Sequence, residues 1–423
     1  MSKTFAGFGF GPIQSGLFLY EAIRSGNFSR YVISEVDEKT VRAVADSGNS
    51  CVVNIARPGG IDHVRIENIE LYNPNDPSQR EAFLNAAARS DEMATSLPSI
   101  RFFDLAGPAC VANLIASAID RRETSFPTIV YTAENHNHAA EYLHQAVLKY
   151  LQPQKLANVQ FLNTVVGKMS GVITDEDAIR KLKLQPMASG LTKAVLVEEF
   201  NRILISPISL ANFKRGIEVF VEKPDLLPFE EAKLYGHNAI HALIGFLADY
   251  KNLATIAQAG LDESIMKIAR NAFIKESGLA LCRRRAAVDD ELFTERGFAE
   301  YADDLLRRMT SPYLHDLVVR VVRDPLRKLA FDDRMFGLMH ICLEQKIVPD
   351  NLAIGAAAGI TSLVRRQNEL THKPVCMPKS VEQLTKESLA ALLSELWAGK
   401  ADKYSQQMID LTWNGVQKLH SIG

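Results

Sequence analysis

Hydrophobic and polar positions follow different patterns in the two halves of the chain. Up to about residue 210, short apolar runs typical of strands lie between stretches with helical periodicity. The patterns predict strands at 4–9, 30–36, 65–72, 101–106, 128–133, 159–163 and 193–200, and helices at 13–25, 38–47, 109–121 and 137–149. Strands that alternate with helices are typical of a parallel-rich sheet with helices on both faces, so we expect an α/β domain over residues 1–210.

From about residue 228 onward, apolar residues recur three or four positions apart, and no alternating stretch predicts a strand. This spacing predicts helices over 229–250, 252–260, 263–274, 299–309, 313–323, 333–346, 350–365, 381–397 and 402–418. We therefore expect a mainly α-helical domain over residues 211–423, with the segment 205–228 crossing between the domains. A chain of 423 residues is long enough for two domains.

Composition narrows the class of protein. Hydrophobic residues make up 47% and charged residues 23% of the chain, which is typical of soluble globular proteins. The net charge of −2 gives no basic signature, and no run of 18 apolar residues predicts a membrane span. The five cysteines form no CxxC pair, and the N-terminus has no signal-peptide pattern. We therefore expect a cytoplasmic protein with reduced thiols and with neither nucleic acid nor membrane as its partner.

A glycine-rich turn follows the first predicted strand directly. Gly9 and Gly11 would allow a tight turn, in which a pyrophosphate can approach backbone N–H groups at a helix N-terminus. Pro12 suits the first helical turn, because its missing N–H would have had no partner there. Gln14 occupies the place of the third glycine of the GxGxxG pattern. The turn predicts a Rossmann-type dinucleotide-binding domain, and the alternative is an ordinary glycine turn.

Glu35 follows the second predicted strand, where dinucleotide-binding folds carry an acidic residue. A carboxylate at this place can accept hydrogen bonds from both ribose hydroxyl groups and would repel the 2′-phosphate of NADP. We therefore expect NAD as the cofactor. The alternative is a surface glutamate without a ligand.

The stretch 230–241 places several polar side chains on one predicted helix. Lys233, His237 and His241 are spaced four residues apart, and Asn238 lies between the two histidines. An α-helix would present a base, an amide and an imidazole on one stripe. The apolar residues that follow predict a buried helix, and burial helps a lysine to lose its proton near neutral pH. A solvated helix end is the alternative interpretation.

A second polar cluster combines basic residues at 320, 323, 327 and 328 with acidic residues at 316, 324, 332 and 333. Such a pattern is typical of a structural network of ion pairs. A basic pocket for an anionic substrate is the alternative. Pro325 opposes the second interpretation, because it can start a new helix and turn Arg327 away from Arg323.

Taken together, these motifs resemble those of the polyol-specific long-chain dehydrogenases, the mannitol dehydrogenase family. The resemblance covers residues 1–340. Its motifs GxGxIxxGF, DVN, AVGP, CEN, KLxxxNxxH and RVxRxPxRKL correspond, in order, to Gly9–Gly16, Glu35–Asp37, Leu105–Pro108, Ala133–Asn135, Lys233–His241 and Arg320–Leu329. Three departures concern the substrate pocket, namely Gly167–Lys168 in place of an Asp–Arg pair, Ile240 in place of a glycine, and Ser311 in place of an asparagine.

The resemblance implies an NAD-dependent, metal-independent enzyme that interconverts a sugar alcohol and a ketose, with mannitol 1-phosphate and fructose 6-phosphate as the expected pair. Lys233 would be the base, and Asn163 and Asn238 would donate to the substrate oxygen. His241 would orient the substrate hydroxyl group or the lysine, and Glu230 would relay protons.

The same resemblance implies binding residues. The cofactor would contact Gly9, Gly11, Pro12, Ile13, Gln14, Glu35, Gly107, Pro108, Glu134 and Asn135, and a substrate phosphate would contact Arg323, Arg327 and Lys328. We expect a monomer or a small homo-oligomer. Two alternatives stay open: a dehydrogenase of a nonphosphorylated polyol or sugar acid, and a noncatalytic NAD-binding homologue.

Overall fold

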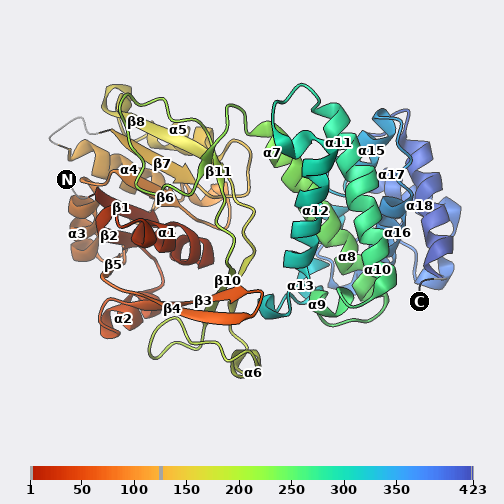
Figure 1. Ribbon diagram of the computed structural model, residues 1–423, viewed down its shortest axis with the longest axis horizontal. Coiled ribbons are helices and arrows are strands. Elements are labelled where there is room, and N and C mark those ends of the chain that lie inside the picture. Colours follow the sequence, from red (N-terminus) through yellow and green to blue (C-terminus); the bar gives the residue numbers. More distant parts are fainter. Residues whose placement is uncertain (1–2, 123–126, 421, 423) are drawn as a thin grey trace. The chain divides into compact units, whose positions relative to one another are not determined.

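The computed structural model describes residues 3–122, 127–420 and 422. The chain divides into two compact units, Met1–Leu227 and Pro228–Gly423 (Figure 1). This division lies later than the boundary expected after residue 210. The segment after residue 210 stays with the first unit because β12 (Val221–Glu222) pairs with β11 (Leu204–Ile205), and because the Gly216 N–H donates to the buried carboxylate of Glu92.

A sheet of eight strands is the centre of the first unit, as far as the described residues show. Its order is β12-β11-β8-β7-β6-β1-β2-β5. The six strands from β8 to β5 are all parallel, and β11 joins β8 in the antiparallel direction. The bounds of these six are β8 (Val159–Val165), β7 (Thr128–Thr132), β6 (Glu92–Thr95), β1 (Lys3–Phe8), β2 (Phe28–Ser34) and β5 (Ile69–Tyr72). This is the doubly wound order of dinucleotide-binding folds, in which ligands bind outside the carboxyl ends of the two central strands.

Alternate residues of β1 pack into two hydrophobic cores on opposite faces of the sheet. Phe5 lies in one core with η1 (Gln14–Leu19) and α1 (Tyr20–Ser25). Ala6 and Phe8 lie in the other core, with α3 (Pro77–Ala87), α4 (Val111–Asp120) and α5 (Ala139–Val147). Figure 1 shows α1 on one face of the sheet and α3 to α5 on the other. The expected α/β architecture is therefore confirmed.

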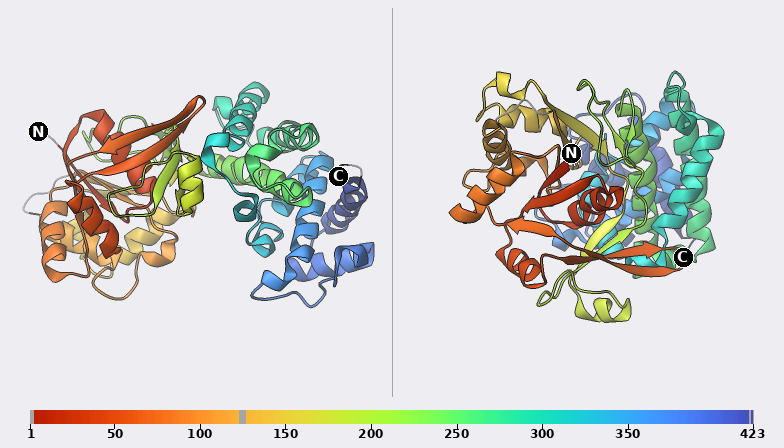
Figure 2. Two further views of the ribbon diagram at one scale, coloured as in Figure 1. Left: turned by 90° about the horizontal axis from the view of Figure 1, so that it is seen from below. Right: turned by 60° about the vertical axis from the view of Figure 1, so that its left-hand side comes forward.

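A smaller mixed sheet adjoins the first, with the order β4-β3-β10-β9 (Figures 1 and 2). Its strands are β4 (Gly60–Ile66), β3 (Cys51–Arg57), β10 (Ala194–Glu198) and β9 (Ser170–Ile173). The single strand predicted at 65–72 is wrong: Asn68, with a φ of 59°, separates β4 in this sheet from β5 in the large one. The strand predicted at 101–106 is also wrong, because η2 (Ile100–Phe102) and turns occupy that stretch. Short helices α2 (Glu38–Asp46), η3 (Pro153–Leu156) and α6 (Glu176–Lys181) complete the unit.

The second unit contains helices and no named strand among its described residues, which confirms the predicted helical domain. Helix α16 packs against both α8 and α18, and glycines at its contacts allow close approach: a β-carbon on Gly355 would meet Leu243. None of the helices in the described residues could cross a membrane. The helices are α7 (Leu227–Glu231), η4 (Ala232–Asn238), α8 (Ala239–Tyr250), α9 (Ile256–Ala259), α10 (Glu263–Asn271), η5 (Ala272–Gly278), α11 (Leu279–Arg284), η6 (Glu291–Phe293), α12 (Glu295–Met309), η7 (Pro312–Leu314), α13 (Val318–Val321), α14 (Pro325–Lys328), α15 (Phe336–Glu344), α16 (Asp350–Arg365), η8 (Gln367–Glu369), η9 (Val381–Gln383), α17 (Lys386–Leu396) and α18 (Ser405–Leu419).

Candidate active site

A cavity of about 620 Å³ lies at the carboxyl ends of β1, β2 and β6 in the first unit. Gly9 has a φ of 82°, and a β-carbon there would lie 2.9 Å from the carbonyl oxygen of Ser96. A β-carbon on Gly11 would meet no atom within 4 Å, so the turn is open on that side. The glycine turn therefore leaves a ligand free to approach the backbone. The lining residues are Phe8, Gly9, Phe10, Gly11, Pro12, Ile13, Ser34, Glu35, Val36, Ser96, Leu97, Pro98, Phe102, Leu105, Ala106, Ala109 and Val111.

Glu35 connects the end of β2 to the glycine turn. Its Oε2 accepts a hydrogen bond from the Phe10 N–H at 2.7 Å, and its Oε1 accepts one from the Asp37 N–H at 2.8 Å. Each oxygen has a second lone pair, so the carboxylate can still accept from a ligand hydroxyl group. Val36, 57% exposed, adds an apolar surface beside it. The carboxylate is therefore fixed in a position suited to the hydroxyl groups of a ribose.

Gln14 is completely buried and does not line the cavity. Its side chain lies against Gly7 of β1, where a β-carbon would collide with the Gln14 amide. Neither polar atom of this amide has a hydrogen-bond partner in the described part of the chain. Gln14, the first residue of the π-helical segment η1, therefore packs against β1 and does not face the cavity.

Glu134 is a buried carboxylate beneath the loop that lines the cavity. The Thr95 hydroxyl and the Leu97 N–H both donate to it at 2.9 Å. Burial raises the pKa of Glu134 to about 7, although these hydrogen bonds oppose the shift. Asn135, next to it, is exposed. Glu134 thus holds the loop after β6 in place.

Gly107 and Pro108 lie on an exposed loop of the same unit. Gly107 has a φ of 110°, a left-handed conformation that favours glycine. The two residues are not among those that line the cavity, but their neighbours Ala106 and Ala109 are. A direct contact of Gly107 or Pro108 with a cofactor stays a prediction.

The lysine motif of the second unit lies on a π-helix. In η4, backbone hydrogen bonds run from residue i to i+5, so Asn238, five residues after Lys233, lies one turn above it. His237 is buried, whereas Lys233, Asn238 and His241 are partly exposed. The charges of Lys233 and His241 both act on His237, and the rings of His237 and His241 lie 6.4 Å apart, so the three residues of the expected stripe are neighbours. Asn238 makes no side-chain hydrogen bond within the described residues, which leaves its amide available to a ligand.

The environment of Lys233 makes its amine a weaker base than an ordinary lysine. Burial lowers the pKa of Lys233 to about 8. The positive charge of Arg334 reinforces this shift, and the carboxylate of Glu230, on α7, opposes it. A substantial fraction of the amine is therefore neutral near physiological pH. Arg334, which the sequence analysis did not single out, is a contributor to the site.

His241, on α8, is paired with a carboxylate that the sequence analysis had assigned only to a salt-bridge network. Its Nε2 lies 2.7 Å from Oδ2 of the buried Asp316. The other oxygen, Oδ1, accepts from Nη2 of Arg320 at 2.6 Å and from its Nε at 3.0 Å. Burial favours the neutral form of Asp316, but the hydrogen bonds and charges of His241 and Arg320 outweigh it, and the pKa of Asp316 is lowered. His241 therefore faces an ionised carboxylate.

Asn163 lies in the second half of β8 in the first unit, and its side chain makes hydrogen bonds there. Its Oδ1 accepts from the Ala140 N–H at 2.8 Å, and its Nδ2 donates to Glu141 at 2.8 Å. Nearby, the buried Lys168 donates to the carbonyl oxygen of Phe200 at 2.8 Å. The role of Asn163 as a donor to the substrate stays a prediction, and Lys168 has a structural contact in place of the family's charged pair.

The three expected phosphate ligands do not share one helical side, although the positive charges of Arg323 and Arg327 both act on Lys328. Pro325 begins the separate helix α14, so the single helical side assumed for Arg323, Arg327 and Lys328 does not exist. Arg327 donates to Asp324 at 2.7 Å, and the buried Lys328 donates to the Val321 carbonyl at 2.7 Å. The side chain of Arg323 is exposed and makes no hydrogen bond or ion pair among the described residues. Of the three, Arg323 keeps all its side-chain donors available to a ligand, whereas Arg327 has part of its guanidinium engaged by Asp324 and Asp333.

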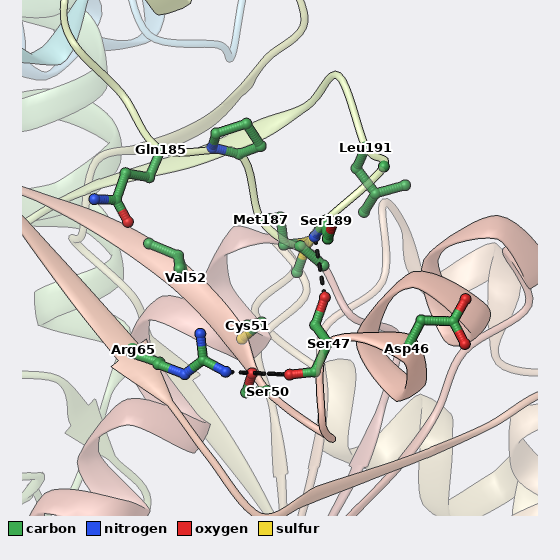
Figure 3. A pocket seen from close by; sticks show the side chains of 13 residues that line it. Asp46, Ser47, Ser50, Cys51, Val52, Arg65, Gln185, Met187, Ser189 and Leu191 are labelled. Atoms are coloured by element: carbon green, nitrogen blue, oxygen red, sulfur yellow. Dashed lines mark hydrogen bonds between the residues drawn. The ribbon is translucent and has the colours of Figure 1, made fainter.

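A second hollow of the first unit, about 530 Å³ in volume, lies between α2, β3, β4 and the loop 185–191 (Figure 3). Its polar groups already bind one another: the Ser189 N–H donates to the Ser47 hydroxyl at 3.0 Å, and Arg65 donates to the Ser47 carbonyl at 3.1 Å. Burial raises the pKa of the Cys51 thiol to about 12. The hollow therefore offers no activated group. Among the described residues, no group of His, Cys, Asp or Glu could hold a metal ion.

Comparison with known proteins places the second unit in a family. Residues 225–410 match the model of the mannitol dehydrogenase C-terminal domain. The chain is 26% identical to a mannitol-1-phosphate 5-dehydrogenase of Exiguobacterium sibiricum over 357 residues, which cover 84% of each protein. It is 28% identical to the enzyme of the same name from Anoxybacillus flavithermus over 342 residues, covering 78% of this chain and 81% of the relative.

Two solved structures share the fold. One is a D-sorbitol dehydrogenase in substrate-free form, with a TM-score of 0.76 and 14% identity, covering 99% of this chain and 93% of the other. The second is mannitol 2-dehydrogenase of Pseudomonas fluorescens in a ternary complex with NAD and D-mannitol, with a TM-score of 0.68 and 15% identity, covering 99% and 92%. Residues 225–410 thus match the C-terminal domain of mannitol dehydrogenases, and most of the chain is similar in sequence to mannitol-1-phosphate 5-dehydrogenases.

Proposed function

We propose that the protein is an NAD-dependent polyol dehydrogenase, in which Lys233 accepts the proton of the substrate hydroxyl group. The observation that carries this proposal is the group formed by Lys233, Asn238 and His241 on one helix of a mannitol dehydrogenase domain. The pKa of about 8 at Lys233 allows the amine to take up a proton during alcohol oxidation and to return it during ketone reduction.

The cavity of the first unit fits NAD. The open glycine turn offers backbone N–H groups for a pyrophosphate, and Glu35 presents a fixed carboxylate to a ribose. When bound, the nicotinamide ring supplies the hydride acceptor. The protein's own residues hold the cofactor and move the proton, and no metal ion is part of the proposed mechanism.

Asn238 is proposed to stabilise the substrate oxygen. An alkoxide develops negative charge as its proton leaves, and an amide N–H one helical turn from Lys233 can donate to that oxygen. Since the Asn238 amide has no other partner in the described residues, no hydrogen bond has to break before it binds the substrate. Glu230 acts on Lys233 through its negative charge, and a relay of protons through it is part of the proposal.

We propose mannitol 1-phosphate and fructose 6-phosphate as the substrate pair, supported by the relatives with those names and by the unpaired guanidinium of Arg323. An uncharged polyol is the second candidate. It is favoured by the internal hydrogen bonds of Arg327 and Lys328, which leave a phosphate with fewer cationic ligands.

The test measures NADH oxidation with fructose 6-phosphate, fructose and several keto acids, together with NADH affinity by fluorescence. Lys233→Met is expected to reduce turnover by roughly 10²–10⁴-fold. Its NADH dissociation constant should stay unchanged, because the cofactor site lies in the other unit. Lys267→Met, at an exposed position of α10, is the matched control. Full turnover by Lys233→Met would refute its role as base, and NADH binding without turnover of any substrate would identify a noncatalytic homologue.

A chelator provides a separate test of metal independence. EDTA is expected to leave the rate unchanged. Inhibition by EDTA that zinc reverses would show that a metal ion takes part in the reaction.

A further inference from the structure

Asp316 is placed between two donors that lie on different sides of its carboxylate. Oδ2 faces Nε2 of His241, and Oδ1 faces the guanidinium of Arg320. The side chain of Asp316 is 6% exposed, and that of His241 is 17% exposed. The carboxylate therefore has little freedom to exchange these partners for water.

The backbone around Asp316 is also held. Its carbonyl oxygen accepts from the Ile256 N–H at 2.9 Å, and the Val318 N–H donates to the Ala254 carbonyl at 3.0 Å. Between these bonds, Leu317 forms an antiparallel bridge with Thr255. The segment that begins α9 thus fixes Asp316 in front of α8, where His241 lies.

This geometry decides which nitrogen of His241 carries hydrogen. An ionised carboxylate can only accept, so Nε2 must be the protonated nitrogen of the neutral ring. Nδ1 then has a lone pair and can only accept. No hydrogen bond to Nδ1 is made by any residue that the structure describes. The ring of His237 lies at 6.4 Å, edge to face, and closes another side of the imidazole.

We propose that Asp316 is a positioning residue that holds His241 in the Nε2–H tautomer, so that Nδ1 accepts a hydrogen bond from a substrate hydroxyl group. The inference rests on the proposed polyol dehydrogenase activity. It assigns His241 one of the two roles expected from the sequence, namely to orient the substrate. It also explains why an ionised side chain lies buried beside the lysine motif: the carboxylate selects the acceptor form of the ring.

The variant Asp316→Asn tests the proposal without changing the shape of the side chain. Arg320 can only donate, so the amide oxygen of the new side chain should turn toward Arg320. The amide NH₂ group then faces Nε2 of His241 and donates to it, which forces hydrogen onto Nδ1. A hydroxyl donor would meet an N–H group in place of a lone pair. We expect kcat/KM for the polyol to fall roughly 10- to 100-fold, with the melting temperature and NADH affinity close to wild type.

The same substitution in a variant that lacks Arg320 distinguishes control of the His241 tautomer from general damage to the site. In the double variant Asp316→Asn/Arg320→Met, the guanidinium that would attract the amide oxygen is gone. The amide can then turn its oxygen toward His241, which restores the Nε2–H tautomer. The Asp316→Asn substitution should therefore cost much less activity in the Arg320→Met background than in the wild type. The double variant is compared with Arg320→Met itself, so any direct effect of Arg320 cancels.

The tautomer is read directly from the ¹⁵N chemical shifts of the side chain in protein labelled at histidine, with the His241 signals assigned through His241→Gln. We expect Nε2–H in the wild type, Nδ1–H in Asp316→Asn, and Nε2–H again in the double variant. An unchanged tautomer in Asp316→Asn overturns the proposal, and so does a changed tautomer with unaltered kcat/KM. Because the spectrum needs no substrate, a wild-type protein that shows Nε2–H but turns over no polyol would refute the proposed activity and not the control of the ring by Asp316.

Discussion

The side-chain amide of Gln14 fills the space that a side chain on Gly7 would need. Gly7 lies in β1 and Gln14 begins η1, so the two residues meet where the helix crosses the strand. In the GxGxxG pattern, a glycine on the helix gives this close approach. Here the helix carries the large residue and the strand carries the glycine, so the missing third glycine of the turn has a counterpart seven residues earlier in the chain.

This relationship predicts that the two positions are energetically coupled. Gly7→Ala should destabilise the first unit by about 1–3 kcal/mol, because the added β-carbon overlaps the Gln14 amide. Gln14→Ala should remove most of that cost in the double variant Gly7→Ala/Gln14→Ala. Urea unfolding of all four proteins measures the coupling. Strictly additive effects would show that the two side chains do not compete for the same space.

The pKa of Lys233 predicts the pH dependence of the reaction. The base must be neutral for alcohol oxidation, so kcat/KM for the polyol should rise with pH and level off above about pH 8. Ketone reduction needs the protonated amine and should decline above the same pH. Initial rates in both directions measure the two profiles. A rate of oxidation that does not change between pH 6 and pH 9 would exclude Lys233 as the titrating base.

Two neighbouring charges should move these profiles in opposite directions. Arg334 lowers the pKa of Lys233, so Arg334→Met should shift the profile to higher pH. Glu230 raises the pKa of Lys233, so Glu230→Gln should shift it to lower pH. The two variants serve as controls for each other, because damage to the site would lower the rate without opposite shifts.

Cofactor choice should depend on Glu35. Glu35→Ala removes the acceptor for the ribose hydroxyl groups and the charge that repels a 2′-phosphate. We expect the preference for NADH over NADPH to narrow by roughly 10- to 100-fold in binding titrations. Glu38→Ala, an exposed position in the first turn of α2, is the matched control and should keep the preference. Equal binding of NADH and NADPH by the wild type would contradict the role of Glu35.

Two basic residues near α14 should have different roles: Arg323 should contact the ligand, and Lys328 should stabilise the fold. Lys328→Met leaves the carbonyl oxygens of Val321 and Arg323 without their donor and should cost about 1–3 kcal/mol of stability. Arg323→Met should keep the stability and raise KM for fructose 6-phosphate, with no change for fructose. Thermal unfolding and kinetics distinguish the two effects. A KM for fructose 6-phosphate that stays at its wild-type value would favour an uncharged substrate.

Local sequence was enough to locate the glycine turn at the cavity and the helix that carries the lysine motif. Gly9, Gly11 and Glu35 lie just after the strands that position them. The order of strands and helices along the chain was therefore enough to predict where these residues lie. The boundary after residue 210 was misplaced because the crossing segment looks like a linker until its pairing with β11 is known. The strand predicted at 101–106 failed for a related reason, since its apolar residues line or support a cavity and do not pair with a neighbour.

The carboxylate partner of His241 could not be identified from the sequence. Asp316 lies 75 residues away along the chain and is surrounded there by other charges, so its pattern equally predicts a network of surface ion pairs. Only the folded contact shows which of these carboxylates reaches the imidazole. Arg334 could not be predicted as part of the site for the same reason, because its charge acts on Lys233 through space from a different element.

The π-helical turn of η4 also changes how the length of this helix can vary. Each residue added to or removed from an α-helix turns everything beyond it by about 100°. A π-helical segment holds one residue more per hydrogen-bonded turn, so a single deletion within 234–236 can return it to an α-helix while α8 keeps its buried face toward α16. The same deletion inside α8 would rotate that face toward solvent. The extra residue of η4 therefore changes which side chains lie near Lys233 without changing which face of α8 is buried.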